Sequence, residues 1–434
     1  MSATDTARGG RVPLVLRNRA FGAVWLGQVL TQAAARMFQV GVAWWLVAYA
    51  VDGGRGLASG LFMAVSTLPA VALAPVVARV LARHEHRSVL RTTAALAGAV
   101  AGALAVWAWT SGLPVPAVYA ATLALATCQA FFDPCLTTSV PELVDDEDIE
   151  TATGFELSTQ SLAGLGGALL GALIVDRAGP AGLAAGCAAA YLAAALLIAG
   201  VRFRTAPAPA EGAGDAGDEP GKRSLLGILR SLPHVRRILV CFTAANLFTT
   251  AVFVVIPLYT RTELGDGGGT VALLEACLGT GTLIGSFTGA RVPGRPTTAG
   301  AYCLALMTLA LALPGLVPGR PAIAGGLAVA GWCVGVIGVR FVALFQRLVP
   351  TADKPGFFAV MQAVLGASFP VASLLFGLAG DHLSARALCL IQAAGLVPAA
   401  CALALLGTGP REPGAPEPAG AAGARTPEPV GGER

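Results

Sequence analysis

The sequence contains twelve apolar runs, each long enough to cross a lipid bilayer as a helix. A hydrocarbon core of roughly 30 Å needs about 20 helical residues at 1.5 Å per residue. Because these runs lack the alternating pattern of outer-membrane strands, only helices satisfy their backbone groups in lipid. The sequence therefore predicts an all-α membrane protein with twelve transmembrane helices. The runs are Phe21–Val51, Leu57–Val80, Leu90–Trp109, Pro114–Val140, Leu157–Val175, Ala181–Val201, Ile238–Tyr259, Val271–Ala290, Thr298–Leu316, Ala322–Leu344, Phe357–Leu378 and Ala385–Leu406.

The composition agrees with a surface that faces lipid. Of the 434 residues 55% are apolar and only 12% are charged, whereas a soluble domain carries about 25% charged residues. All nine cysteines fall inside apolar runs and none forms a C-x-x-C pair. Neither a disulfide framework nor a zinc site is indicated.

The basic residues predict the orientation of the chain. With both termini on one side, that side holds 22 of the 29 Lys and Arg residues and the opposite side holds 5. Such a bias marks the cytoplasmic side. Only Lys222 and Lys354 are lysines, and with abundant Ala and Gly this is typical of a high-GC bacterial genome. We expect a multi-pass protein of the bacterial cytoplasmic membrane with cytoplasmic termini.

A polar segment divides the spans into two groups of six. Ala206–Gly221 consists of Pro, Gly, Ala and acidic residues and predicts a flexible linker. We expect bundles at residues 1–201 and 238–408, a cytoplasmic linker at 202–237 and a disordered cytoplasmic tail at 409–434. The motif G-F-x4-Q-x3-G begins at Gly154 and again 202 residues later at Gly356. Such a repeat favours two pseudo-symmetric six-helix bundles with a binding site between them.

The first run carries a stripe of polar residues. Gln28, Gln32, Arg36 and Gln39 are spaced 4, 4 and 3 residues apart, with Trp25 beside them. At about 100° per residue they share one helical face, and this face is too polar for lipid. One interpretation is that the stripe binds substrate or couples its movement. The other is that it joins helices through hydrogen bonds.

The fourth run contains Gln129 and Asp133, one turn apart. An ion pair between Arg36 and Asp133 is disfavoured, because their depths differ by roughly 12 Å at 1.5 Å per residue. Asp133 is a candidate proton-binding carboxylate, and the alternative is a structural role near the cytoplasmic mouth.

The second half offers further candidates for a cavity wall. Asn246 shares a face with Thr243 and Thr250, and the tenth run contains Trp332 and Arg340. The alternatives are helix packing for Asn246 and a snorkelling side chain for Arg340.

The eighth run combines an acidic residue with small ones. Glu275 is an open candidate for the site, whereas Gly281, Gly285 and Gly289 form two G-x-x-x-G steps. These glycines predict close approach of a neighbouring helix.

Residues 16–21 (LRNRAF) and 25–28 (WLGQ) resemble the entry into the first helix in the bacterial drug- and siderophore-efflux branch of the major facilitator superfamily. The resemblance covers nearly the whole chain by topology. It implies a fold in which helices one, four, seven and ten surround a central cavity.

The resemblance also concerns the loop after the second run, residues 78–87 (ARVLARHEHR). Arg83 and Arg87 match the family motif G-x-L-A-D-R-x-G-R-R, which implies a cytoplasmic gate there, but Ala82 stands at the acidic position. Gly164, Gly167 and Gly171 in the fifth run look like the antiporter motif of exporters without its proline. Ala126 replaces an arginine common in the fourth helix.

The function predicted from these features is secondary active transport. A Walker phosphate loop, H-E-x-x-H and G-x-S-x-G are absent, so we expect no enzyme, no catalytic residue, no metal site and no cofactor. We expect proton-coupled efflux of a small amphipathic organic compound by alternating access. The expected partners are this small-molecule substrate, protons and membrane lipids, with no nucleic acid, and the chain is expected to be a monomer. An uptake permease and a non-transporting membrane scaffold or sensor are the alternatives.

Overall fold

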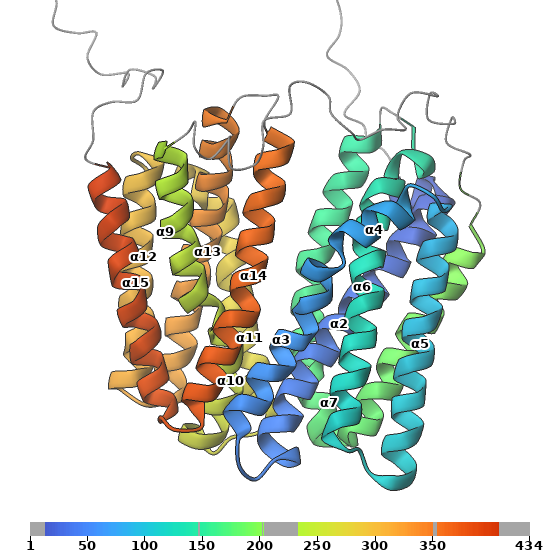
Figure 1. The fold of residues 1–434 in the computed structure, drawn as a ribbon, viewed down its shortest axis with the longest axis horizontal. Helices are drawn as coiled ribbons and strands as arrows, with labels where there is room; N and C mark the ends of the chain where they lie inside the picture. The colour runs from blue at the N-terminus through green and yellow to red at the C-terminus, as the bar shows by residue number, and fades with distance from the viewer. Residues whose placement is uncertain (1–13, 146–147, 202, 204–232, 350–353, 408–434) are drawn as a thin grey trace, which may run out of the picture.

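Two helical bundles stand side by side in the computed structural model, which describes residues 14–145, 148–201, 203, 233–349 and 354–407 (Figure 1). Within these ranges all regular secondary structure is helical. The predicted linker at 202–237 lies mostly outside the described residues, and the predicted tail at 409–434 lies entirely outside them.

The first bundle is built from residues 14–201. Asn18 caps the N-terminus of the first long helix, which begins at Arg19. Its side chain accepts hydrogen bonds from the backbone N–H groups of Ala20 and Phe21. The elements are α1 (Leu14–Arg17), α2 (Arg19–Trp45) with its π-helical extension η1 (Leu46–Ala50), α3 (Arg55–Ala72), α4 (Ala74–Leu81), α5 (His86–Ser111), α6 (Val115–Leu143) and α7 (Ile149–Ala199).

The second bundle repeats this plan in residues 233–407. Its elements are α9 (Pro233–Thr250), α10 (Val252–Tyr259) with the π-helical turn η3 (Thr260–Leu264), α11 (Gly268–Thr288) with the 3-10 turn η4 (Gly289–Arg291), α12 (Pro296–Leu316), α13 (Arg320–Leu348), α14 (Lys354–Gly380) and α15 (Ala385–Gly407). The described chain begins at Leu14 and ends at Gly407 at the same end of the molecule (Figure 1). We call it the termini end and the opposite end the far end.

Helix α7 is a hairpin of two crossings. Gly179 has φ 66° and ψ −174°, a backbone conformation almost confined to glycine, and the chain reverses there. Both arms pack on α2 near one residue: a Cβ at Gly41 would lie 2.6 Å from Leu183 and 2.9 Å from the carbonyl oxygen of Gly171. The arms before and after Gly179 are the fifth and sixth crossings.

Twelve crossings follow for the described part of the chain. Ten segments are long and apolar enough to span a membrane, with α7 contributing one and α2 none. The polar stripe lowers the hydropathy of α2, although its 27 residues are long enough to cross. Adding α2 and counting both arms of α7 gives the predicted twelve.

The outer surface is apolar. Large side chains such as Trp109, Leu196, Phe287 and Leu405 are more than 70% exposed. On a soluble monomer so much exposed apolar surface would promote association, whereas here it faces lipid. The protein is a multi-pass membrane protein.

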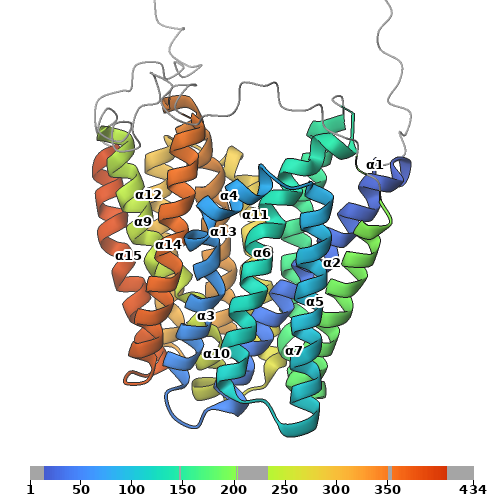
Figure 2. The ribbon, with the colours of Figure 1, turned by 45° about the vertical axis from the view of Figure 1, so that its right-hand side comes forward.

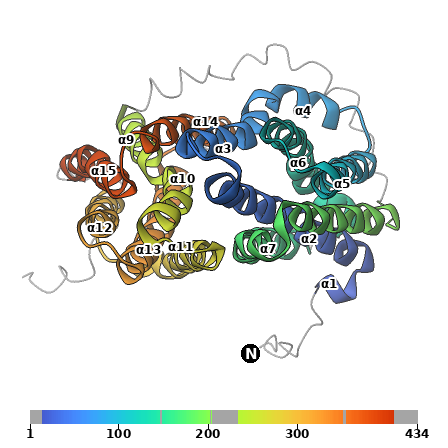
Figure 3. The ribbon, with the colours of Figure 1, turned by 90° about the horizontal axis from the view of Figure 1, so that it is seen from below.

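The two bundles meet along two helix pairs, α3 with α14 and α7 with α11 (Figures 2 and 3). The first pair is a seam of small residues. A Cβ at Gly60 would lie 2.2 Å from the carbonyl oxygen of Ser373, and a Cβ at Gly377 would lie 2.6 Å from that of Gly56. The seam therefore admits no larger side chain.

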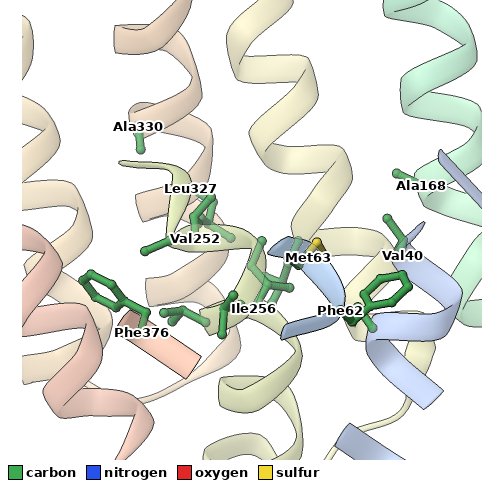
Figure 4. Close-up of a cluster of buried hydrophobic side chains, with 14 of the residues drawn as sticks. Val40, Phe62, Met63, Ala168, Val252, Ile256, Leu327, Ala330 and Phe376 are labelled. Atoms are coloured by element: carbon green, nitrogen blue, oxygen red, sulfur yellow. The ribbon is translucent and has the colours of Figure 1, made fainter. Parts of the chain in front are cut away.

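A continuous apolar layer also joins the bundles (Figure 4). Phe62 and Met63 of α3 belong to the same buried cluster as Val252 and Ile256 of α10 and Phe376 of α14. Four hydrogen bonds between described residues join the bundles, one at mid-depth and three at the far end. The molecule is thus held closed at its far end.

Candidate functional site

A cavity of about 390 Å³ lies among α2, α3, α6 and α7 of the first bundle. This volume lies within the roughly 300–1,000 Å³ of small-molecule sites. Amide, hydroxyl, charged and aromatic side chains share its wall. The lining residues are Gln32, Ala35, Arg36, Phe38, Gln39, Phe62, Ser66, Thr122, Leu125, Ala126, Gln129, Asp133, Gly164 and Tyr191.

Asp133 is held in this wall by two amides. Its Oδ1 accepts hydrogen bonds from Nε2 of Gln32 at 2.6 Å and from Nε2 of Gln129 at 2.5 Å. Gln32 belongs to α2, whereas Gln129 lies one turn before Asp133 on α6. The amides orient the carboxylate and tie the first crossing to the fourth.

Arg36 joins the first bundle to the second. Its guanidinium donates to Oε1 of Gln39 at 2.5 Å and to Oε2 of Glu275 on α11 at 2.9 Å. It also lies over the ring of Phe253 on α10, 4.8 Å from the centroid, within cation–π range. Arg36 is therefore a contact between the halves as well as a lining residue.

The burial of this ion pair makes its two charges interdependent. The Glu275 side chain is 6% exposed and the Arg36 side chain 23%. Removing two charges from water is costly, and the pair offsets that cost only while both partners stay in contact. A change at either side chain therefore acts on the contact between the bundles.

Trp25 and Gln28 lie on α2 but do not line the cavity. The indole N–H of Trp25 donates to Oγ1 of Thr159 at 2.5 Å, and its ring meets Phe155 edge-on. Gln28 is 2% exposed. In this structure Trp25 packs α2 against α7, and Gln28 is enclosed within the bundle.

The candidates of the second bundle are likewise engaged in helix packing. Nδ2 of Asn246 donates to Oγ of Ser368 at 2.6 Å and to the carbonyl of Leu365, which joins α9 to α14. Nε1 of Trp332 donates to Oγ1 of Thr288 at 2.9 Å, which joins α13 to α11.

Arg340 also stays within its own bundle. Its guanidinium donates to the carbonyl of Gly294 in the turn before α12. The second bundle thus reaches the site through Arg36, by way of Glu275 and Phe253, and none of its described residues lines the cavity.

The glycine steps of α11 pack as expected. A Cβ at Gly281 would lie 2.2 Å from the carbonyl oxygen of Ala328, and one at Gly285 would lie 2.1 Å from that of Trp332. These contacts hold α11 against α13 and thereby set the depth at which Glu275 of α11 lies in the molecule. Across the described ranges no three His, Cys, Asp or Glu side chains lie close enough together to hold a metal ion.

A family model described as the Major Facilitator Superfamily matches residues 24–321. The chain belongs to the major facilitator superfamily. No curated protein matches the sequence. This family is one of transporters rather than enzymes, and its members bind small-molecule substrates.

Solved structures of major facilitator transporters share the fold of this chain at low sequence identity. An auto-inhibited POT family peptide transporter has a TM-score of 0.68 at 11% identity, over 91% of this chain and 98% of its own. A D-xylose–proton symporter has a TM-score of 0.66 at 14% identity, over 88% and 96%. A bacterial homologue of the iron transporter ferroportin, in an inward-facing state, has a TM-score of 0.68 at 12% identity, over 90% and 99%.

The loop that resembles the family's gate motif does not touch the second bundle through its arginines. Arg83 is exposed at the termini end. Arg87 donates to the carbonyl of Ala199 at the end of α7, at 2.7 Å, and so ties α5 to the sixth crossing. In this conformation Arg87 closes the first bundle on itself, and Ala82 offers no carboxylate to a partner helix.

Two further contacts between the bundles involve residues that the sequence analysis did not single out. Asp176 of α7 accepts from the backbone N–H of Gly268, and Asp381 accepts from those of Gly56 and Leu57. Neither carboxylate belongs to a polar stripe, and the donors are main-chain groups. The spacing of polar side chains in the sequence therefore does not predict these two contacts.

Proposed function

We propose that this transporter exports a small amphipathic organic molecule across the bacterial cytoplasmic membrane in exchange for protons, by alternating access between its two bundles. The observation that carries the proposal is the mid-depth cavity whose Arg36 is paired across the bundles with Glu275. A site on one bundle, linked by a charge pair to the other, allows occupancy or protonation to act on the contact between the halves.

The chemistry of the wall supports an amphipathic substrate. Phe38, Phe62 and Tyr191 provide apolar area, while Gln32 and Gln129 hold Asp133 against the cavity. Apolar walls with a few oriented polar groups are typical of sites for organic ligands.

The direction of transport is proposed from charge and closure together. The excess of basic residues favours a cytoplasmic position for the termini end, and in that orientation the closed far end faces the periplasm. The conformation is then one that loads substrate from the cytoplasm. The cavity wall and the Glu275 partner of Arg36 come from one chain, which supports a monomer.

Two carboxylates are available for coupling. A proton on Glu275 would remove the charge that holds Arg36, whereas a proton on Asp133 would weaken its bonds to Gln32 and Gln129. Intramembrane acids that face a cavity or a charge partner are the usual carriers of protons in transporters.

The proposal is tested in two steps. Susceptibility profiling of an efflux-deficient bacterial host that expresses the protein identifies exported compounds, and uptake of the best one is then measured in inverted vesicles. We expect an imposed pH gradient to drive accumulation and its collapse to abolish it. Accumulation that is unchanged after collapse overturns proton coupling, uptake in the opposite direction identifies a permease, and no compound moved by any vesicle overturns transport.

A matched pair of variants separates the site from the scaffold. Gln32→Leu removes an amide that lines the cavity, whereas Gln392→Leu removes a buried amide of α15 that donates to the carbonyl of Phe248. We expect the first variant to lose most transport and the second to keep it. Equal losses would indicate that amides serve packing at both places.

A further inference from the structure

The far end of the molecule holds two carboxylates that reach across from one bundle to the other. Asp176 lies near the end of the first arm of α7. It is held within its own bundle by Nε1 of Trp44 at 2.6 Å and by the hydroxyl of Tyr49 at 2.9 Å. Its other oxygen accepts the backbone N–H of Gly268, the first residue of α11.

Asp381 makes the corresponding contact in the opposite direction. It follows the last residue of α14, and its Oδ1 accepts the backbone N–H of Gly56 at 2.7 Å. Its Oδ2 accepts that of Leu57 at 3.1 Å. Both donors lie in the first turn of α3.

The two contacts are related by the pseudo-symmetry of the fold. In each, the acid ends the fifth crossing of one bundle and binds the first turn of the second crossing of the other. The two acids are 205 positions apart, close to the 202-residue offset of the sequence repeat. Figure 3 shows the same two helix pairs, α7 with α11 and α14 with α3, along the junction.

The receiving helices cannot cap themselves. The N-cap residues are Gly54 for α3 and Gly267 for α11, and neither helix has a side-chain cap of its own. The first N–H groups of a helix need an acceptor, and the helix dipole favours a negative one. In both helices this acceptor comes from the opposite bundle, so separation of the bundles removes both caps at once.

We propose that Asp176 and Asp381 form a far-end latch, a pair of positioning residues that keep the far end closed while the cavity is loaded from the termini end. This inference rests on the proposed alternating access. It adds the residues that determine the relative stability of the states closed and open at the far end. The latch opens when the backbone N–H groups of α3 and α11 exchange their carboxylate acceptors for water.

Hydrogen exchange measured by mass spectrometry on the full-length protein in lipid nanodiscs tests the latch without a substrate. In Asp381→Asn the charge is lost while the side chain keeps its shape. Since hydrogen bonds to charged groups are each worth about tenfold or more in an equilibrium, we expect roughly tenfold faster exchange in peptides covering Gly56 and Leu57.

The decisive readout is the distant contact. If the two contacts open together, Asp381→Asn also speeds exchange in the peptide covering Gly268, and Asp176→Asn speeds exchange at Gly56 and Leu57. A cap with a merely local role changes only its own helix. Asp266→Asn is the matched control, because Asp266 is a far-end carboxylate that binds Arg320 and Thr270 within the second bundle. It should leave exchange at Gly56 and Leu57 unchanged, and it serves as the control for that contact because Asp266 lies beside the start of α11.

Exchange that rises only at the substituted contact, or a rise at Gly56 and Leu57 that is as large in Asp266→Asn, overturns the latch. Asp176→Asn also loses charge-assisted bonds to Trp44 and Tyr49, so Asp381→Asn carries the test if that variant is unstable. A cross-effect in a chain that moves no compound would keep the latch and reject the proposed export. A chain that transports a compound but shows no cross-effect would keep the proposed export and reject the latch.

Discussion

Replacing Arg36 and Glu275 singly and together measures how strongly the two bundles depend on their buried ion pair. The variants are Arg36→Gln, Glu275→Gln and the double variant. Each single change leaves one charge at mid-depth without the partner that it has at 2.9 Å. The double change leaves two neutral side chains of similar length.

The magnitude follows from burial. Breaking a buried pair by removing one partner costs about 3–5 kcal/mol, whereas replacing both partners with neutral groups is often close to neutral. Because the Arg36 side chain is 23% exposed, we expect the lower end, about 3 kcal/mol for each single variant. The double variant should then be close to the wild type, so the coupling free energy of the cycle approaches the sum of the two single losses, about 5–6 kcal/mol.

Unfolding in mixed micelles with increasing SDS, followed by circular dichroism, gives the four free energies of the cycle. Transport by all three variants should fall more than tenfold, since the double variant restores neutrality without restoring a charge that responds to protons. A coupling free energy below about 0.5 kcal/mol, the scatter expected for independent sites, refutes the energetic role of the pair. Wild-type transport by the double variant refutes its role in coupling.

Three other outcomes are expected. Asp133→Asn should retain substrate binding in a ligand-protection assay but lose proton-driven accumulation, whereas transport that stays proton-driven would remove this carboxylate from the coupling step. Gly285→Ala should lower the free energy of unfolding by about 2 kcal/mol through overpacking, because its Cβ would lie 2.1 Å from the carbonyl oxygen of Trp332. Gly338→Ala is the control and should not lower it, because no heavy atom lies within 4 Å of the added Cβ. Arg320 holds the pKa of Asp266 below its usual range, so the pair stabilises the fold above about pH 4, and its contribution disappears as the pH falls through the lowered pKa. Thermal unfolding of Asp266→Asn and the wild type should therefore converge in acid, and a constant difference would contradict the assignment.

The twelve crossings and the polar face of α2 could be predicted from the sequence because both depend on local periodicity. Residues four apart on a helix share a face whatever surrounds them, and Gln32, Arg36 and Gln39 indeed lie beside one cavity. Their role in transport stays a prediction. Trp25 and Gln28 obey the same spacing, yet Trp25 lies where α7 packs against α2 and Gln28 is buried outside the cavity wall.

The partners of these residues could not be predicted, because they depend on how distant helices meet. Glu275 is 239 positions from Arg36, and only the position of α11 against α7 selects it. Asp133 lies at a different depth, as the helical rise indicates, and binds amides instead. The contacts of Asp176 and Asp381 are less predictable still. These carboxylates accept hydrogen bonds from backbone N–H groups, so no complementary side chain marks their partners in the sequence.

The glycine seam between α3 and α14 makes the protein open to conformational trapping. At Gly60 even one methyl group would lie 2.2 Å from the backbone of Ser373, so a side chain there acts as a wedge at the junction rather than as a loss of binding chemistry. Gly60→Val should bias the molecule toward the state opened at its far end and leave the cavity wall chemically intact. Such a variant would give structural work a stable sample of the opposite half of the cycle, selected by shape alone.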